Sequence, residues 1–165
     1  MIKDNSEYLE EYLTSERVLA QQEKLIFSKF DLEEVHKIGA YALELFERKD
    51  YPMAVEIRIS DWKALHISFP GTSPENDWWM NRKSKVVNLT GNSSLYERLL
   101  SEEGKYDWFE KKKVSEEDFA IHGGGFPILD LKSNLQAVLL ISGLPQVEDH
   151  LFAYEILRDF RALEI

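Results

Sequence analysis

A run of three glycines, Gly123 to Gly125, restricts how this chain can fold more than any other feature of its sequence. Glycine loses more backbone entropy on folding than any other residue, so a glycine run is typical of positive φ angles or close backbone approach. His122 precedes the run and Phe126 follows it. One interpretation is a ligand pocket, in which backbone N–H groups face the ligand and the imidazole acts as a ligand or an acid–base group. The alternative is a tight strand entry with a structural histidine; we favour the pocket, since a structural turn seldom needs three glycines.

A second turn follows the glycine run after a short strand pair. The sequence Ser142 to Gln146 forms this turn, and Asp149 and His150 follow after two further residues. Asp149 would either cap the final helix or take part in ligand binding. His150 would be either a second ligand or a packed core histidine, and the sequence favours neither alternative.

The remaining hydrophobic pattern predicts an α/β (α+β) fold, in which helices flank a five-stranded antiparallel sheet. We treat residues 1–165 as one domain, with residues 1–20 as an N-terminal helical extension. Asp31 and Glu34 have the spacing of a capping box. The predicted helices are 4–22, 31–48, 75–90, 93–102 and from 149 onwards; the predicted strands are 25–30, 54–59, 64–69, 126–131 and 135–141; and 104–121 is a predicted irregular loop.

The helix predicted over 75–90 places aromatic side chains beside cations. Trp78 and Arg82 share one helix face, and Trp79 and Lys83 share the next. With Asn76 near the start of the helix, this group would suit a flat anionic ligand, which tryptophan would stack on and the cations would pair with. Periodicity alone favours the other interpretation, a core tryptophan beside a solvated charged face.

The composition argues against several classes of protein. The formal charge is −10, from 30 acidic and 20 basic residues, which argues against nucleic-acid binding and against adsorption to anionic membranes. Cysteine is absent, so a disulfide, a thiolate nucleophile and a cysteine zinc site are all excluded. The first residues lack the apolar core of a secretion signal, and we therefore expect a cytoplasmic protein that does not interact with membranes.

Sequence motifs for common catalytic and metal sites are missing. The chain has no His-Glu-x-x-His, no EF-hand loop and no Walker loop, so no metal site is predicted. Ser142 lies outside any Gly-x-Ser-x-Gly pattern, which weakens a serine hydrolase interpretation. His36 and His66 have no partner pattern, and a lone histidine is more often structural.

Three sequence blocks together resemble a known family: Pro70 to Trp79 with Arg82 and Lys83, His122 to Ile128, and Ser142 to Gln146 with Asp149 and His150. They are similar to the haem-degrading (HbpS/GlcG-like) superfamily, in its uncharacterised branch of short bacterial and fungal proteins, over roughly residues 20–163. The resemblance implies a profilin-like fold and a homo-oligomer, a dimer or higher. Ala137 stands where the family usually has a glycine, and a larger side chain there would narrow any pocket nearby.

The resemblance also implies a function. Relatives in the superfamily bind haem or a related tetrapyrrole and some degrade it, so we expect a small-molecule ligand of this kind, with haem-degrading activity left open. His122 would hold the iron, Gly123, Gly124, Gly125 and Phe126 would give access, Trp78 or Trp79 would stack, and Arg82 and Lys83 would meet ligand carboxylates. The alternative is a non-catalytic oligomeric interaction module, with the tryptophan helix as interface core.

Overall fold

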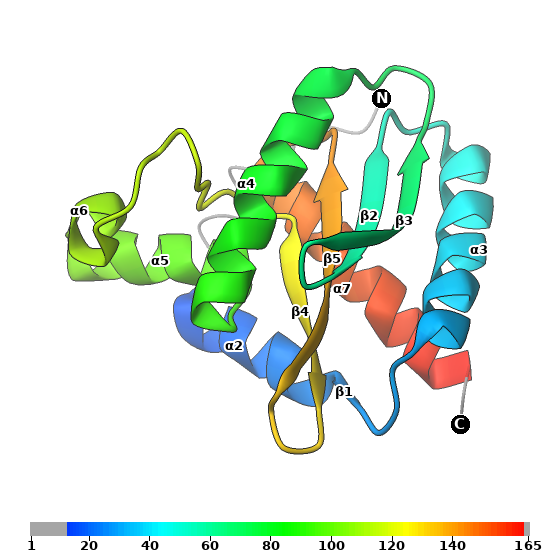
Figure 1. The fold of residues 1–165 in the computed structure, drawn as a ribbon, viewed down its shortest axis with the longest axis horizontal. Helices are drawn as coiled ribbons and strands as arrows, with labels where there is room; N and C mark the ends of the chain where they lie inside the picture. The colour runs from blue at the N-terminus through cyan, green and yellow to red at the C-terminus, as the bar shows by residue number, and fades with distance from the viewer. Residues whose placement is uncertain (1–12, 164–165) are drawn as a thin grey trace.

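The computed structural model describes residues 13–163, and the part of the predicted helix 4–22 before residue 13 lies outside them. Within this range a five-stranded sheet has the order β1-β4-β5-β2-β3 (Figure 1). The strands are β1 Ile26–Phe27, β2 Ala54–Ile59, β3 Trp62–Ser68, β4 Gly125–Asp130 and β5 Leu135–Ser142. The helices are α2 Ser15–Lys24, α3 Leu32–Lys49, α4 Pro74–Thr90, α5 Ser94–Gly104, α6 Trp108–Lys112 and α7 Gln146–Leu163.

Helices cover both faces of the sheet, with α4 on one side and α7 on the other (Figure 1). Because side chains alternate along a strand, Val55 and Ile57 of β2 join the core formed with α3 and α7. Ala54 joins a smaller core with Met80 and Val87 of α4. β2 is therefore buried on both faces, and its polar residues, Glu56 among them, also lie on the α4 side.

The prediction of a fully antiparallel sheet is wrong at one edge. β1 pairs with β4 in parallel, through Ile26 opposite Leu129 and Phe27 opposite Asp130. No hairpin joins these two strands, so their relative direction is set by how α2 and α3 pack and not by a local turn. The other strand pairs are antiparallel: β2 with β3 and β4 with β5 in the two predicted hairpins, and β2 with β5 between them.

Local capping signals in the sequence are confirmed. Asp31 and Glu34 form a capping box at the start of α3. Ser73 and Asn76 form a second one at α4, with Ser73 as the N-cap and Asn76 bonding back to the Ser73 N–H. A capping box satisfies two N–H groups that the first helical turn leaves without partners. The start of α4, and with it the position of Asn76, is therefore fixed by short-range contacts.

The structure departs from the predicted helices most clearly at α6 and at the start of α7. The segment 104–121 is not entirely irregular, because Asp107 caps the short helix α6 and the indole of Trp108 is buried. α7 begins at Gln146 and not at Asp149. Asp149 therefore lies within the first turns of α7, and it is not the N-cap of this helix. Over the described residues, no helix has both the length and the hydropathy that crossing a membrane requires.

Candidate functional site

The glycine run is packed against three helices at the end of β4. A Cβ atom on Gly123 would lie 2.2 Å from the Gln146 carbonyl oxygen, and one on Gly124 would lie 2.3 Å from that of Ile141. Gly124 also has a φ of 124°, which favours glycine. These glycines line neither cavity described below, so protein packing by itself explains the need for them.

Ser94 of α5 fastens the loop that carries His122. Its hydroxyl donates to the His122 carbonyl oxygen at 2.6 Å and accepts from the Gly125 N–H at 3.0 Å. Gln146 of α7 accepts from the Gly123 N–H at 2.9 Å. The backbone of the loop is thus held by α5 and α7 together, which fixes the position of the His122 imidazole.

The His122 imidazole is half-buried and packs edge-on against the Trp79 ring, with 4.8 Å between ring centroids. Burial, with a smaller effect of the positive charges of Arg98, Lys83 and Arg82, lowers the pKa of His122 to about 4. The imidazole is therefore neutral at pH 7, with a nitrogen lone pair available. A neutral imidazole is the form that ligates metals and the iron of haem.

A first cavity of about 290 Å³ lies between α4 and the turn that follows β5. Its volume is at the lower end for small-molecule sites. It brings together five of the residues singled out in the sequence: Asn76, Trp79, Lys83, His122 and Asp149. The sequence analysis did not identify the other lining residues as candidate ligand contacts. These residues are Glu75, Ser142, Gly143, Leu144 and Gln146.

Lys83 and Asp149 form a buried ion pair at the wall of the first cavity. The Lys83 ammonium lies 3.4 Å from Asp149 Oδ2 and donates to the Ile141 carbonyl oxygen at 3.1 Å. Asp149 Oδ1 accepts from the Leu144 N–H at 2.9 Å. Burial raises the pKa of Asp149 to about 6 and lowers the pKa of Lys83, while each charge opposes the shift of the other.

A second cavity, of about 320 Å³, lies on the other side of His122. His122 is the residue that the two cavities share. Two cations, Arg82 and Arg98, and two acids, Glu102 and Glu116, line the second cavity, and Arg98 pairs with Glu102 at 2.8 Å. The Arg82 guanidinium stacks on Trp78 at 4.0 Å, which confirms the predicted shared face, and it also donates to the carbonyl oxygens of Glu116 and Phe119.

The other candidate residues lie away from both cavities. Phe126 and His150 are completely buried, with 5.5 Å between their ring centroids, and His150 bonds to Gln21. This burial favours the core-histidine alternative for His150. Trp78 is 48% exposed and covers Arg82. Ala137 faces the core and lines neither cavity, so it narrows neither of them.

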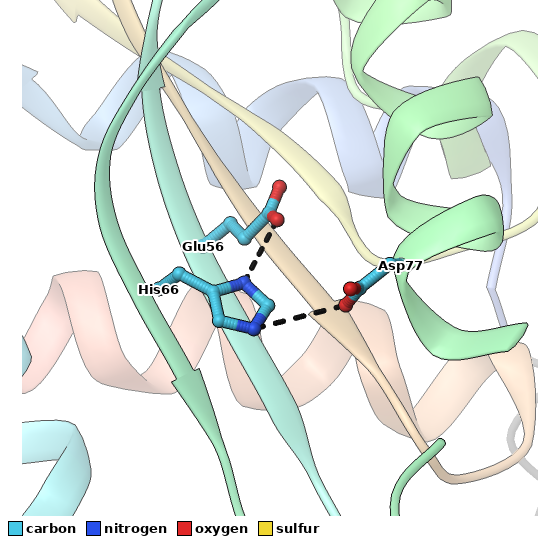
Figure 2. Close-up of side chains that lie close together, drawn as sticks. All are labelled: Glu56, His66 and Asp77. Atoms are coloured by element: carbon cyan, nitrogen blue, oxygen red, sulfur yellow. Dashed lines mark hydrogen bonds and ion pairs between the residues drawn. The ribbon is translucent and has the colours of Figure 1, made fainter. Parts of the chain in front are cut away.

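His66 has partners that the sequence pattern did not reveal. Its ring lies between Glu56 of β2 and Asp77 of α4 (Figure 2). Neither partner is near His66 in the sequence, and only the pairing of β2 with β3 and the packing of α4 bring them together. No short-range sequence signal could have found this group.

Comparison with known proteins places the chain in a family. A family model described as haem degrading protein HbpS-like matches residues 30–158. The chain belongs to the HbpS-like family. Among similar HbpS-like chains, a UPF0303 protein of Streptomyces avermitilis is 33% identical over 141 residues, which cover 86% of each chain. A UPF0303 protein of Lactiplantibacillus plantarum is 29% identical over 147 residues, 88% of this chain and 94% of that one.

Solved structures share the HbpS-like fold. The Ybr137w protein has a TM-score of 0.86 at 27% identity, over 100% of this chain and 98% of that one. The PduOC:Heme complex has a TM-score of 0.65 at 15% identity, over 78% and 93%. At 15% identity the second likeness shows the fold alone, and the haem in that complex belongs to that protein.

Proposed function

We propose that this HbpS-like protein binds haem or a related tetrapyrrole beside His122. The observation that carries the proposal is a half-buried, neutral imidazole at the boundary between two cavities. Family membership supports it, since relatives of the same fold include a haem complex. The bound iron would supply oxygen binding and activation, and turnover of the haem stays an open expectation.

The residues around His122 fit such a group. The imidazole supplies a nitrogen ligand that carries no proton at neutral pH, and Trp79 offers an aromatic wall beside it. Arg82 of the second cavity offers a positive charge to a ligand carboxylate, and Arg98 offers one that it shares with Glu102 on the protein surface. Lys83 suits this role less well, because its ammonium is buried and paired with Asp149. A whole macrocycle exceeds either cavity, so one edge of it would stay open to solvent or to another subunit of a homo-oligomer.

The test is a hemin titration followed in the Soret region. We expect a saturable, near-stoichiometric Soret shift for the native protein, and at least tenfold weaker binding with a displaced Soret maximum for His122→Ala. His36→Ala, at an exposed position of α3, is the matched control and should bind like the native protein. Equal binding by the native protein and His122→Ala would mean adventitious adhesion, and no binding at all would favour the interaction module.

A further inference from the structure

A second polar site lies outside both cavities, where β2, β3 and α4 meet. His66 of β3 points between Glu56 of β2 and Asp77 of α4 (Figure 2). His66 Nδ1 is 2.9 Å from Glu56 Oε1, and His66 Nε2 is 3.7 Å from Asp77 Oδ1. None of the three residues lines either cavity, so an inference about them does not depend on the proposed function.

The buried Glu56 carboxylate holds the His66 ring in one orientation. Glu56 is fully buried, and its Oε2 accepts from Arg58 Nε at 2.7 Å. With Oε2 engaged, Oε1 accepts the His66 Nδ1–H, and the Nε2 lone pair then faces α4. Metal-ligating histidines nearly always donate their second ring N–H to a carboxylate or carbonyl in this manner.

Asp77 completes the arrangement on the exposed side. Two ligands held about 2.1 Å from one tetrahedral ion lie roughly 3.4 Å apart, so a small movement of the half-exposed Asp77 side chain closes the 3.7 Å separation. Ser68 now donates its hydroxyl to His66 Nε2 at 2.9 Å. Ser68 is exposed and its hydroxyl can rotate away, which frees the lone pair.

We propose that His66 Nε2 and the Asp77 carboxylate bind a divalent transition-metal ion of the Zn²⁺ class, with Glu56 as the residue that positions the imidazole. Imidazole and carboxylate together suit this class of ion better than Mg²⁺ or Ca²⁺, which take oxygen ligands.

Asp77 is the carboxylate that would offset the charge of a dication. Arg58 alone balances Glu56, and Lys63 adds a further positive charge beside it. Lys63 is half-exposed at 3.6 Å from Glu56 and can turn into solvent as the ion arrives. Water completes the coordination, because the His66 and Asp77 side chains are 33% and 45% exposed. With two protein ligands, the affinity should be lower than that of a four-ligand structural zinc site.

The experiment is a calorimetric titration of the full-length protein with Zn²⁺. We expect one equivalent for the native protein, loss of saturable binding for His66→Ala, and at least tenfold weaker binding for Asp77→Asn. Asp77 is half-exposed, so Asp77→Asn should keep the fold even where His66→Ala does not. His36→Ala and Asp61→Asn should each bind Zn²⁺ within twofold of the native protein, since neither residue belongs to the site.

A spectroscopic measurement tests the role of Glu56. Nitrogen-15 NMR should show His66 as the Nδ1–H tautomer in the free protein, with the Nε2 signal shifting when Zn²⁺ is added. Glu56→Gln should change the tautomer population and weaken Zn²⁺ binding by about 10–100-fold. The proposal is overturned if the native protein shows no saturable binding, if Asp77→Asn binds as tightly as the native protein, or if Zn²⁺ leaves the His66 signals unmoved.

Discussion

Lys83 and Asp149 lie 66 residues apart in the chain, yet their charged groups approach to 3.4 Å, with each side chain only 3% exposed. Gly124 packs directly on this pair, because a Cβ atom there would lie 2.8 Å from Lys83 Nζ and 3.2 Å from Asp149 Cβ. The ion pair thus joins α4, α7 and the glycine loop at the wall of the first cavity.

Removing one partner of this pair should destabilise the fold strongly. Lys83→Met leaves a buried carboxylate unpaired, and such changes typically cost about 3–5 kcal/mol in the free energy of unfolding. The pKa of Asp149, already raised to about 6, should rise further in the variant, so the cost should be smaller at pH 5 than at pH 8. Urea unfolding at the two pH values measures this, and the double variant Lys83→Met, Asp149→Asn is the control that should lose the difference. If Lys83→Met loses the same free energy of unfolding at both pH values, the unpaired Asp149 carboxylate is not the cause of the destabilisation.

Acid sensitivity should depend on the buried His150. Burial lowers its pKa in the folded protein to about 3, from an ordinary value of 6.5 in the unfolded chain. The unfolded state therefore binds more protons between these values, and the free energy of unfolding falls as the pH drops below 6.5. One proton contributes up to about 1.4 kcal/mol per pH unit. His122 acts in the same direction, and Asp149 acts in the opposite direction between its ordinary pKa and about 6.

The variant His150→Gln should therefore show a shallower loss of stability than the native protein when both are unfolded in urea between pH 4.5 and 6.5. Because His122 and Asp149 are present in both proteins, their contributions cancel in the comparison. His36→Gln is the matched control at an exposed position and should keep the native slope. If the free energy of unfolding of His150→Gln falls with pH as steeply as that of the native protein, His150 is not the source of the acid sensitivity.

The glycine run should tolerate side chains poorly. In Gly124→Ala the backbone has a φ of 124°, and the added Cβ atom would lie 2.3 Å from the Ile141 carbonyl oxygen. The variant should lose about 3 kcal/mol or more of the free energy of unfolding. Gly91→Ala is the matched control, because Gly91 also has a positive φ but no atom within 4 Å of its added Cβ. It should cost about 1–2 kcal/mol, the cost of the backbone conformation alone. Thermal unfolding compares the two, and equal costs would mean that close packing at Gly124 is unimportant.

The hydroxyl of Ser94 should matter for both stability and ligand binding. Ser94→Ala leaves the buried Gly125 N–H without this acceptor, which should cost about 1–3 kcal/mol, and it releases the loop that carries His122. Hemin affinity should fall in the folded variant, measured by the Soret titration. Thr72→Ala, the control, removes a hydroxyl bond to the nearby Phe69 carbonyl oxygen away from both cavities and should leave hemin affinity unchanged. If Ser94→Ala binds hemin as tightly as the native protein, the hydrogen bonds of Ser94 to the loop are not needed for hemin binding.

The sequence by itself determined the parts of the protein that depend on near neighbours. The capping box at Asp31, the hairpins and the stacking of Trp78 on Arg82 each involve residues a few positions apart. Pattern and propensity report such contacts directly. The glycine run likewise signalled close backbone approach, although its packing partners on α4, α5 and α7 were not visible in the sequence.

Only the tertiary structure decided which polar residues meet. It paired Lys83 with Asp149 and His66 with Glu56, set β1 parallel to β4, and placed His122 beside the cavities but His150 in the core. Apart from the His66–Glu56 contact, which lies across one hairpin, these outcomes depend on how elements distant in the chain pack, and one sequence carries no local signal for that packing. Two histidines in similar sequence contexts thus differ because burial and neighbouring charge, which set an imidazole's chemistry, are properties of the folded chain.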